Sequence, residues 1–412
     1  MDPRAKTVYR ANVPAFFDSN ADGLGDINGV AAKIDYIKEL GADTLMLSPV
    51  LLPGSFEVNA ELGTAKDLDS LIDKAASRMI GTVLEMPAVM HLNDAGYLTK
   101  AADVMRLWLD RGAMGVAINT DELTASGDKR PMHRAICALN KAVFSLYPDC
   151  FTVGIGKNVS FEDAVQLTRS ENRELMMQLN IPPLMAEAFS PSPAGLGALF
   201  GGNSLKRFRH DTDYYQVQST LKGGRFLNGI SLPQGEFSTQ QELTRRLRSK
   251  AACLYCMTLC GTPLIRQGDE IGLYAEGSPM QWSNSRAAGF TVGTPQIKGD
   301  STLSHINVED DMTHMDSVCS FYKRAIALRH AHSALISGDY VPVDSENARI
   351  AAYTRSDGAE SLLTVINISD RTSKVNLAGF KKGECLIFTN SPKPLAESMK
   401  LQPYEGFVYR LR

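Results

Sequence analysis

The sequence predicts an α/β protein, a (β/α)8 TIM barrel followed by a small antiparallel β domain. Two observations support this prediction. Over residues 1–333, short apolar runs alternate with stretches in which apolar residues recur at helical spacing. Over residues 334–412, the pattern changes to short alternating runs, which are typical of antiparallel strands. We therefore assign residues 1–333 to the barrel and residues 334–412 to a C-terminal β-sandwich.

The first βα unit is clear from its periodicity. Residues 7–13 and 44–48 are apolar runs typical of strands, and between them apolar residues recur at helical spacing from Val30 to Leu40, until Gly41 ends the helix. Further strands are expected at residues 82–86, 115–118, 151–153, 175–179, 226–230 and 263–266, and further helices at residues 65–77, 101–109 and 134–144. Eight such strands close into a barrel whose working face is formed by the loops after the strands.

The antiparallel domain is expected to begin after the last barrel helix. Its strands are predicted at residues 349–354, 362–368, 385–388 and 407–411.

Composition excludes several classes of protein. The 43 Lys and Arg residues nearly balance the 46 Asp and Glu residues, so the formal net charge of −3 argues against a nucleic-acid partner. The charge-free run 251–265 is shorter than the roughly 18 residues of a membrane span, and no signal peptide is visible. Within that run, Cys253, Cys256 and Cys260 have the spacing of a buried helix face. The odd number of cysteines, seven, leaves their pairing open.

One loop has the composition of a calcium site. Residues 18–26 read Asp-Ser-Asn-Ala-Asp-Gly-Leu-Gly-Asp, which places oxygen-bearing side chains at alternate positions around flexible glycines. The loop is not an EF-hand, because the twelfth position is Gly29 and a strand precedes it. Spacing alone leaves two interpretations open, a calcium loop and a polar loop whose Asp residues cap a helix.

Several segments resemble the α-amylase family, glycoside hydrolase family 13, and within it the oligo-1,6-glucosidase branch. They are Phe-Asp-Ser-Asn-Ala-Asp-Gly-Leu-Gly-Asp at 17–26, Leu-Ser-Pro at 47–49, Gly-Thr-Pro-Leu-Ile-Arg-Gln-Gly-Asp-Glu-Ile-Gly at 261–272, Pro-Met-Gln-Trp at 279–282 and Ala-Leu-Ile-Ser-Gly-Asp-Tyr at 334–340. The resemblance implies a structural Ca²⁺ held by Asp18, Asn20, Asp22, the Leu24 carbonyl and Asp26.

The resemblance also implies three carboxylates after strands four, five and seven, two of which cleave the glycosidic bond. The matching positions of this chain are Asn119, Ile155 and Ile230, and none of these side chains is a nucleophile or proton donor. The lobe that the enzymes insert after strand three is missing too, since only residues 92–98 separate that strand from the next helix. We therefore expect no catalytic residue and no turnover of maltose, isomaltose or sucrose.

A barrel without catalytic carboxylates or inserted lobe, ending in Leu-Gln-Pro-Tyr-Glu-Gly at 401–406, resembles the ectodomains of 4F2-type heavy chains of heteromeric amino-acid transporters. That resemblance implies a non-enzymatic, single-pass type II glycoprotein at the plasma membrane. Its partner would be a light-chain transporter subunit, disulfide-linked through a stalk cysteine upstream of this chain. The glycan acceptor patterns at Asn158 and Asn367 suit that location.

Two other functions remain open from the sequence. The first is an α-glucosidase with atypical catalytic residues, and the second is a secreted carbohydrate-binding protein descended from one. The identity of a light chain, the amino acids moved and the interface residues do not follow from the sequence.

Overall fold

The structure, a computed structural model, describes residues 2–87, 95–119, 130–155, 176–179, 197–222, 226–229, 242–273, 277–299 and 305–412. Within them, parallel strands pair in chain order and close into an eight-stranded barrel, so the predicted (β/α)8 fold is confirmed. The strands are β1 (Val8–Ala11), β2 (Thr44–Leu47), β3 (Gly81–Glu85), β4 (Gly115–Asn119), β5 (Phe151–Ile155), β6 (Met176–Leu179), β7 (Phe226–Gly229) and β8 (Thr262–Arg266).

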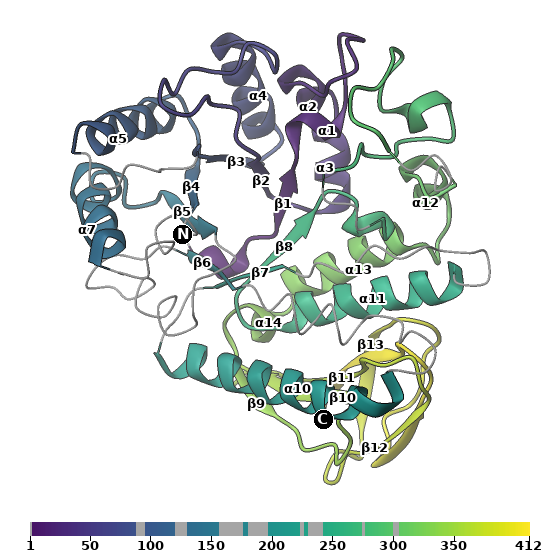
Figure 1. The fold of residues 1–412 in the computed structure, drawn as a ribbon. Coiled ribbons are helices and arrows are strands. Elements are labelled where there is room, and N and C mark those ends of the chain that lie inside the picture. The colour runs from purple at the N-terminus through teal and green to yellow at the C-terminus, as the bar shows by residue number, and fades with distance from the viewer. Residues whose placement is uncertain are drawn as a thin grey trace.

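Helices surround the barrel and bury apolar side chains against the outer face of its strands (Figure 1). The α-helices are α1 (Val13–Phe16), α2 (Ile27–Ala32), α3 (Ile34–Leu40), α4 (Ala65–Ser77), α5 (Ala95–Asp110), α7 (Arg130–Leu139), α10 (Gly197–Lys222), α11 (Glu242–Thr258), α12 (Val308–Thr313), α13 (Val318–Ala331) and α14 (Ser333–Ser337). Shorter turns are the 3₁₀ segments η1 (Pro3–Ala5), η4 (Asp269–Ile271) and η5 (Arg286–Gly289) and the π-helical η2 (Asn140–Phe144).

Local signals explain where the predicted helices begin and end. At the start of α4, the Thr64 hydroxyl accepts a hydrogen bond from the Asp67 N–H, and the Asp67 carboxylate accepts one from the Thr64 N–H. At the end of α3, Gly41 has φ of 101°, a left-handed conformation that glycine adopts without strain. The helix predicted at residues 65–77 and the stop at Gly41 are therefore confirmed.

Two expected helices differ in extent. Helix α5 begins at Ala95, earlier than the predicted residue 101, because residues 96–100 of its first turns are exposed or half-buried and give no apolar periodicity. The helix predicted over 134–144 divides into α7 and the π-helical η2. The connection between β3 and α5 comprises only residues 86–94, so the predicted absence of an inserted lobe is confirmed.

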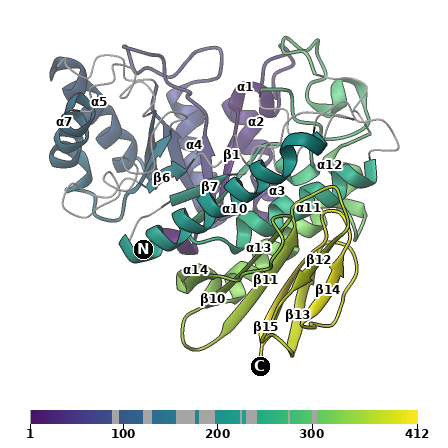
Figure 2. The same cartoon turned by 60° about the horizontal axis from the view of Figure 1, so that its bottom comes forward.

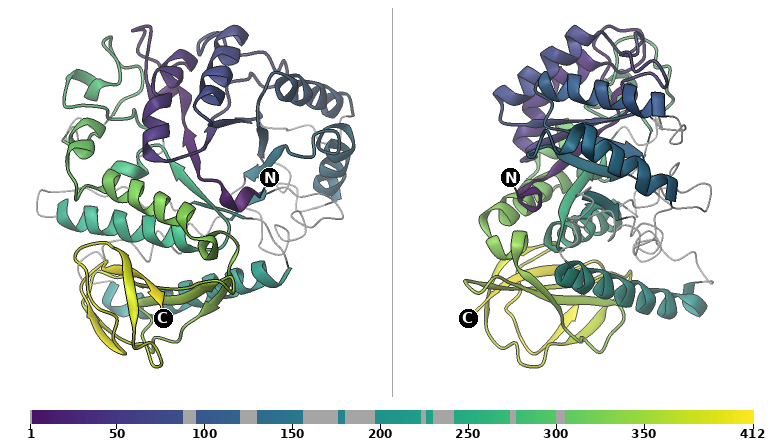
Figure 3. Two further views of the ribbon diagram at one scale, coloured as in Figure 1. Left: turned by 180° about the vertical axis from the view of Figure 1, so that it is seen from behind. Right: turned by 90° about the vertical axis from the view of Figure 1, so that its left-hand side faces the viewer.

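The seven strands β9 to β15 form the C-terminal domain (Figures 2 and 3). They are β9 (Asp339–Pro342), β10 (Ile350–Ser356), β11 (Ser361–Asn367), β12 (Ser373–Asn376), β13 (Gly383–Phe388), β14 (Ser398–Leu401) and β15 (Gly406–Leu411). A five-stranded antiparallel sheet has the order β13-β15-β11-β10-β9, and β12 pairs with β14. One apolar cluster, with Leu363 and Val365 from the large sheet and Val375 and Leu401 from the small one, fills the space between the sheets.

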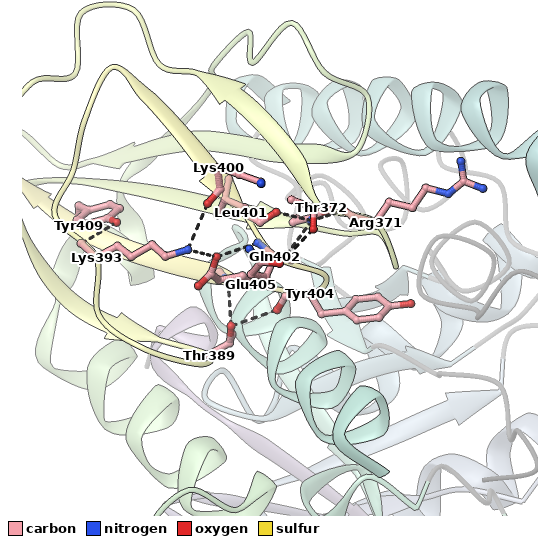
Figure 4. A network of polar contacts seen from close by, with 12 residues as sticks. Arg371, Thr372, Thr389, Lys393, Lys400, Leu401, Gln402, Tyr404, Glu405 and Tyr409 are labelled. Carbon is pink, nitrogen blue, oxygen red and sulfur yellow. Dashed lines mark hydrogen bonds and ion pairs between the residues drawn. The ribbon is translucent and has the colours of Figure 1, made fainter. Parts of the chain in front are cut away.

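The turn between β14 and β15 is held by a buried polar network (Figure 4). Glu405 is only 1% exposed, and its Oε2 accepts hydrogen bonds from Lys393 Nζ at 2.5 Å and from the Gln402 N–H at 2.9 Å. The Thr389 hydroxyl donates to the Tyr404 carbonyl at 3.1 Å. The segment 401–406, which suggested a heavy chain in the sequence, runs from the end of β14 to the start of β15, and buried Glu405 holds the turn between them.

The end of α11 lies between the barrel and the C-terminal domain, and a fully buried arginine caps it. Arg329, on α13, donates to the carbonyl oxygens of Met257 at 2.7 Å, Leu259 at 3.2 Å and Arg4 at 3.1 Å, and also to that of Gly261. Burial, together with the neighbouring charge of Arg355, lowers the pKa of Arg329 to about 9. Arg329 therefore stays mainly protonated at neutral pH, where its charge complements the carboxyl end of the helix dipole.

A second buried arginine approaches the same turn from the C-terminal domain. Arg355, on β10, donates to the Thr258 carbonyl at 2.9 Å and to the Gly338 carbonyl at 3.0 Å and 3.2 Å. The Thr258 hydroxyl lies 2.6 Å from the Tyr353 hydroxyl of the same strand. Strand β10 is thereby bonded directly to the end of a barrel helix.

The three cysteines at the end of α11 are buried, as predicted, and the seven cysteines of the chain, all of which the structure describes, form no disulfide. Burial raises the pKa of the Cys256 thiol to about 12. Thiols in this environment are small apolar groups.

Glu270 is a buried acid outside the barrel interior. Its Oε1 accepts hydrogen bonds from the hydroxyls of Tyr9, on β1, at 2.7 Å and of Tyr36, on α3, at 2.8 Å. Its Oε2 is buried and has no hydrogen-bond partner among the described residues. Burial raises the pKa of Glu270 to about 7, although the two tyrosines act in the opposite direction.

Replacing Arg329 by Met should destabilise the protein by about 3 kcal/mol or more, because several carbonyl groups lose their donor inside the core. Urea unfolding followed by circular dichroism measures this change. Arg324→Met is the matched control on the exposed face of α13 and should shift the free energy of unfolding by no more than about 0.5 kcal/mol. Equal effects of the two substitutions would contradict the capping role.

Glu270→Gln should stabilise the protein at neutral and alkaline pH. The folded-state pKa is raised above the roughly 4.3 of an unfolded Glu, so wild-type stability falls as pH rises from about 4.5 to about 7. The Gln variant lacks this proton linkage, and its amide oxygen can still accept from both tyrosines. Its advantage should grow from near zero at pH 4.5 to on the order of 3 to 4 kcal/mol at pH 8. An advantage independent of pH would refute this assignment.

Candidate functional site

The mouth of the barrel at the carboxyl ends of the strands is the candidate site, because parallel strands place their last side chains together there. Inside the barrel, an apolar layer lies below this mouth, formed by Val8, Met46, Val83, Ala117, Phe151, Val153, Leu227 and Leu264. Side chains alternate along a strand, so the residue two positions after a member of this layer also points inward. Arg10, Glu85, Asn119, Ile155 and Arg266 occupy those positions on five strands.

An ion pair crosses this mouth from β1 to β3. Arg10 donates to Glu85 Oε2 from Nη2 at 2.7 Å and from Nε at 3.1 Å. The Glu85 side chain is 8% exposed and that of Arg10 19%. Glu85 Oε1 has no hydrogen-bond partner among the described residues. Of the inward-facing strand residues that the structure describes, Glu85 is the one carboxylate.

Arg266 adds a second positive charge to the mouth. Strands β1 and β8 pair with Arg10 opposite Arg266, so both side chains point into the barrel. The Arg266 N–H donates to Asp269 Oδ2 at 2.9 Å, but its guanidinium has no partner within the described part of the chain. The next residue, Gln267, fixes the neighbouring loop, since its side chain accepts from the Asn12 N–H at 3.0 Å and donates to the Ala15 carbonyl at 2.8 Å.

The structure places two of the three positions singled out for catalysis where the sequence predicted. Asn119 ends β4 and Ile155 ends β5, and the two residues lie opposite each other in the sheet register. An amide and an alkyl group therefore stand at these strand ends. Ile230 lies outside the described residues, one position after the end of β7.

The ion pair and Arg266 were not singled out from the sequence as site residues. A signal for them exists, because each charged residue lies at or next to the end of a mainly apolar strand and follows an inward-facing apolar residue by two positions. The pairing of Arg10 with Glu85 has no such signal, since 75 residues separate them.

Loop 18–26 is closed by hydrogen bonds from its own backbone. Asp18 Oδ1 accepts from the N–H groups of Asn20 and Ala21 at 3.0 Å and 2.8 Å, and Oδ2 accepts from the Gly23 N–H at 2.7 Å and the Thr291 hydroxyl at 2.5 Å. Partial burial acts to raise the pKa of Asp18, but these donors outweigh it and the net shift is downward.

The side chains of Asn20, Asp22 and Asp26, three further predicted calcium ligands, also have hydrogen-bond partners. Asp26 caps α2, accepting from the Gly29 N–H at 2.6 Å, and the Asn20 amide donates to Asp22 Oδ2 at 2.9 Å. No three His, Cys, Asp or Glu side chains within the described ranges are grouped to hold a metal ion. The donor types suit calcium, but hydrogen bonds alone account for the shape of the loop. Binding of Ca²⁺ by Asp18, Asn20, Asp22, the Leu24 carbonyl and Asp26 stays a prediction.

The predicted glycosylation sites have different outcomes. Asn158 lies outside the described residues. Asn367 is fully buried, and its Nδ2 donates to the carbonyls of Arg371 and Gln402, both at 2.8 Å. A glycan on Asn367 would require this amide to leave the domain core, so the fold argues against modification there.

Comparison with known proteins identifies the family. The model of the alpha-amylase catalytic domain matches residues 13–94 and 90–338, which is most of the chain. The chain belongs to the alpha-amylase family.

Relatives of known name align with the whole alpha-amylase-family chain. An oligo-1,6-glucosidase of Parageobacillus thermoglucosidasius is 25% identical over 557 residues, which span 98% of each chain. A trehalose-6-phosphate hydrolase of Bacillus subtilis is 22% identical over 552 residues, spanning 98% of this chain and 97% of the relative. The alignments exceed the 412 residues of this chain, so the relatives contain segments that it lacks.

The fold agrees with these alignments. The crystal structure of Bacillus licheniformis trehalose-6-phosphate hydrolase superposes with a TM-score of 0.84 at 20% sequence identity, covering 99% of each chain. At this identity the likeness establishes the shared barrel and C-terminal sheet domain.

These findings correct the assignment to transporter heavy chains. The matched relatives are glucosidases and a hydrolase along their whole length, so the heavy-chain family, the non-enzymatic function and the type II plasma-membrane location are wrong. The assignment failed because it gave three replaced side chains more weight than the similarity of the whole chain. None of the helices in the described part of the chain is both long and apolar enough to cross a membrane. The light-chain partner is an untested prediction that has lost the resemblance on which it rested.

Asp18→Asn should lower the free energy of unfolding by about 2 kcal/mol, because an amide nitrogen would face the donors of Gly23 or Thr291. The folded-state pKa of Asp18 is depressed, so its stabilisation is present above about pH 4 and is lost as pH falls through the folded value. The difference from wild type, measured by urea unfolding, should therefore shrink in acid.

Asp22→Asn is the matched control, since Asp22 is exposed in the same loop. It should change the free energy of unfolding by no more than about 0.5 kcal/mol. The same proteins test calcium: a bound ion would raise the wild-type melting temperature in CaCl₂ and not that of Asp18→Asn. Identical wild-type melting in CaCl₂ and in EGTA would contradict the calcium prediction.

Proposed function

We propose that this chain is an α-glucosidase with atypical catalytic residues, acting on short α-glucosides at the mouth of its barrel. The observation that supports it most strongly is the full-length similarity to oligo-1,6-glucosidases, which reaches 25% identity over 98% of both chains. The relatives named for the hydrolysis of oligo-1,6-glucosides or of trehalose 6-phosphate suggest which linkages to test.

The Arg10–Glu85 pair supplies the acidic group that such chemistry requires. Glycoside hydrolysis passes through a transition state with positive charge at the anomeric carbon, which a fixed carboxylate stabilises. Both hydrogen bonds from Arg10 go to Glu85 Oε2, so the carboxylate is oriented and Oε1 is left to face the sugar. Because the pair is largely buried, it is already positioned before substrate binds.

The other described groups of the mouth suit recognition of a sugar. The amide of Asn119 can exchange hydrogen bonds with hydroxyl groups, and the guanidinium of Arg266 is a planar set of donors. Ile155 has no acidic proton, so a proton donor would have to come from a position other than this strand end. The connection after β3 is short, so the mouth has no inserted lobe on that side.

Hydrolysis should be measured with isomaltose, maltose and trehalose 6-phosphate by release of glucose. We expect turnover of at least one of them, and Glu85→Gln should lower its kcat/KM by about 100-fold or more, mainly through kcat. Glu61→Gln, which removes an exposed acid of the loop before α4, is the matched control and should leave kcat/KM unchanged.

Two outcomes would count against this function. Wild-type protein without turnover above buffer for every substrate would refute the glucosidase proposal itself. Turnover that Glu85→Gln leaves unchanged would refute the role of Glu85 and leave the activity to other residues. Thermal melting of each variant separates loss of catalysis from loss of fold.

A further inference from the structure

Two adjoining pockets lie beside loop 18–26, and neither is lined by an inward-facing strand residue. The first has a volume of about 590 Å³ and the second about 530 Å³, and both are lined by Ser285 and Arg286. These volumes are in the range of small-molecule sites. The glucosidase proposal uses neither pocket.

The first pocket contains a lysine without a counter-charge. Lys33 Nζ lies 4.1 Å from the ring centroid of Trp282 and 4.3 Å from that of Phe17. The two rings attract the ammonium through their faces, but Lys33 has no hydrogen-bond or ion-pair partner among the described residues. Burial lowers the pKa of Lys33, which shows that the ammonium is incompletely solvated and gains from a nearby anion.

Arg286 brings a second positive charge to the wall that the pockets share. It is exposed to solvent at the edge of the pocket, and within the described part of the chain it makes no ion pair. The hydroxyls of Ser283 and Ser285, which lie 2.7 Å apart, line the same pocket and offer further donors. Lys33 and Arg286 therefore place two cationic groups on one cavity, and neither forms an ion pair with a described residue.

The two carboxylates on this pocket, Asp18 and Glu309, form no ion pair with Lys33 or Arg286. Asp18 already accepts four hydrogen bonds from its own loop and Thr291. Glu309 is exposed to solvent, and none of the described basic groups pairs with it. Solvent screens the exposed Glu309 carboxylate more strongly than it screens the half-buried ammonium of Lys33.

The second pocket is mainly apolar. Its lining includes Pro279, Ala287, Ala288, Pro295 and Ile297, together with Lys298. Ala287 and Ala288 have φ of 52° and 53°, a left-handed conformation that costs alanine roughly 1 kcal/mol or more each. They are held there by hydrogen bonds, from the Trp282 N–H to the Ala288 carbonyl at 2.7 Å and from the Phe290 N–H to the Ala287 carbonyl at 3.0 Å.

We propose that these pockets together bind a small organic anion. Its phosphate or carboxylate would lie between Lys33 and Arg286, and its apolar part would occupy the second pocket. A sugar suits the first pocket less well, because Trp282 is only 7% exposed and its ring face is covered by Lys33.

Isothermal titration calorimetry with phenyl phosphate tests the proposal, and benzoate distinguishes a carboxylate from a phosphate. Inorganic phosphate and phenol are titrated separately, because they represent the anionic half and the apolar half of phenyl phosphate. Phenyl phosphate should bind at least about tenfold more tightly than either half, since it contacts both pockets. Its affinity should fall as salt concentration rises. Inorganic phosphate binding as tightly as phenyl phosphate would overturn the role of the apolar pocket.

Substitutions locate the site. Lys33→Gln and Arg286→Gln should each weaken phenyl phosphate by about tenfold, because each removes one charged contact. Lys33→Arg should retain binding, and Lys38→Gln, on helix α3 directly after Lys33 but outside the pockets, is the matched control. No saturable binding of either anion to wild type, or equal affinity in all variants, would overturn the proposal. Neither result depends on whether the chain hydrolyses glucosides.

Discussion

The carboxyl end of α11 is the place where the barrel and the C-terminal domain depend on the same hydrogen bonds. A helix ends with carbonyl groups that have no partner of their own and with a partial negative charge. Here that end is buried, so water cannot satisfy it. Arg329 from α13 and Arg355 from β10 supply the donors instead, and both guanidinium groups are buried against carbonyls. A neutral side chain could meet neither the number of acceptors nor the charge.

The segment that follows this turn also contributes to the barrel mouth and to the pockets beside loop 18–26. It leads directly into β8, whose last residue, Arg266, reaches the barrel mouth, and then into η4, which buries Glu270 against Tyr9 and Tyr36. The same stretch of chain continues to Trp282 and the pockets beside loop 18–26. The helix cap, the mouth and the pockets therefore share one segment.

The family and the strand-end chemistry point in different directions, and the structure shows how both statements hold. Asn119 and Ile155 occupy strand ends in the expected register, so the replacements are real features of the barrel. The mouth nevertheless has a buried, oriented carboxylate in Glu85, placed by Arg10 from another strand. The non-enzymatic function was predicted from catalytic side chains that are absent. That prediction did not include the charged groups that only the closed barrel brings together. Similarity over the whole chain is the stronger indication of family, because it samples every element of the fold.

The sequence by itself determined the architecture. Apolar periodicity located the strands and most helices, and local signals such as Gly41 and the Thr64 cap set helix ends, because these depend on neighbours only a few residues apart. The missing lobe followed from the length of one connection. Only the tertiary structure decided the contacts between distant residues: Arg10 with Glu85, Glu270 with two tyrosines, Asn367 with the domain core, and Lys33 with two aromatic rings. Burial and charge at those positions arise from elements that closure of the barrel and docking of the β domain bring together, and no local pattern encodes which elements will meet.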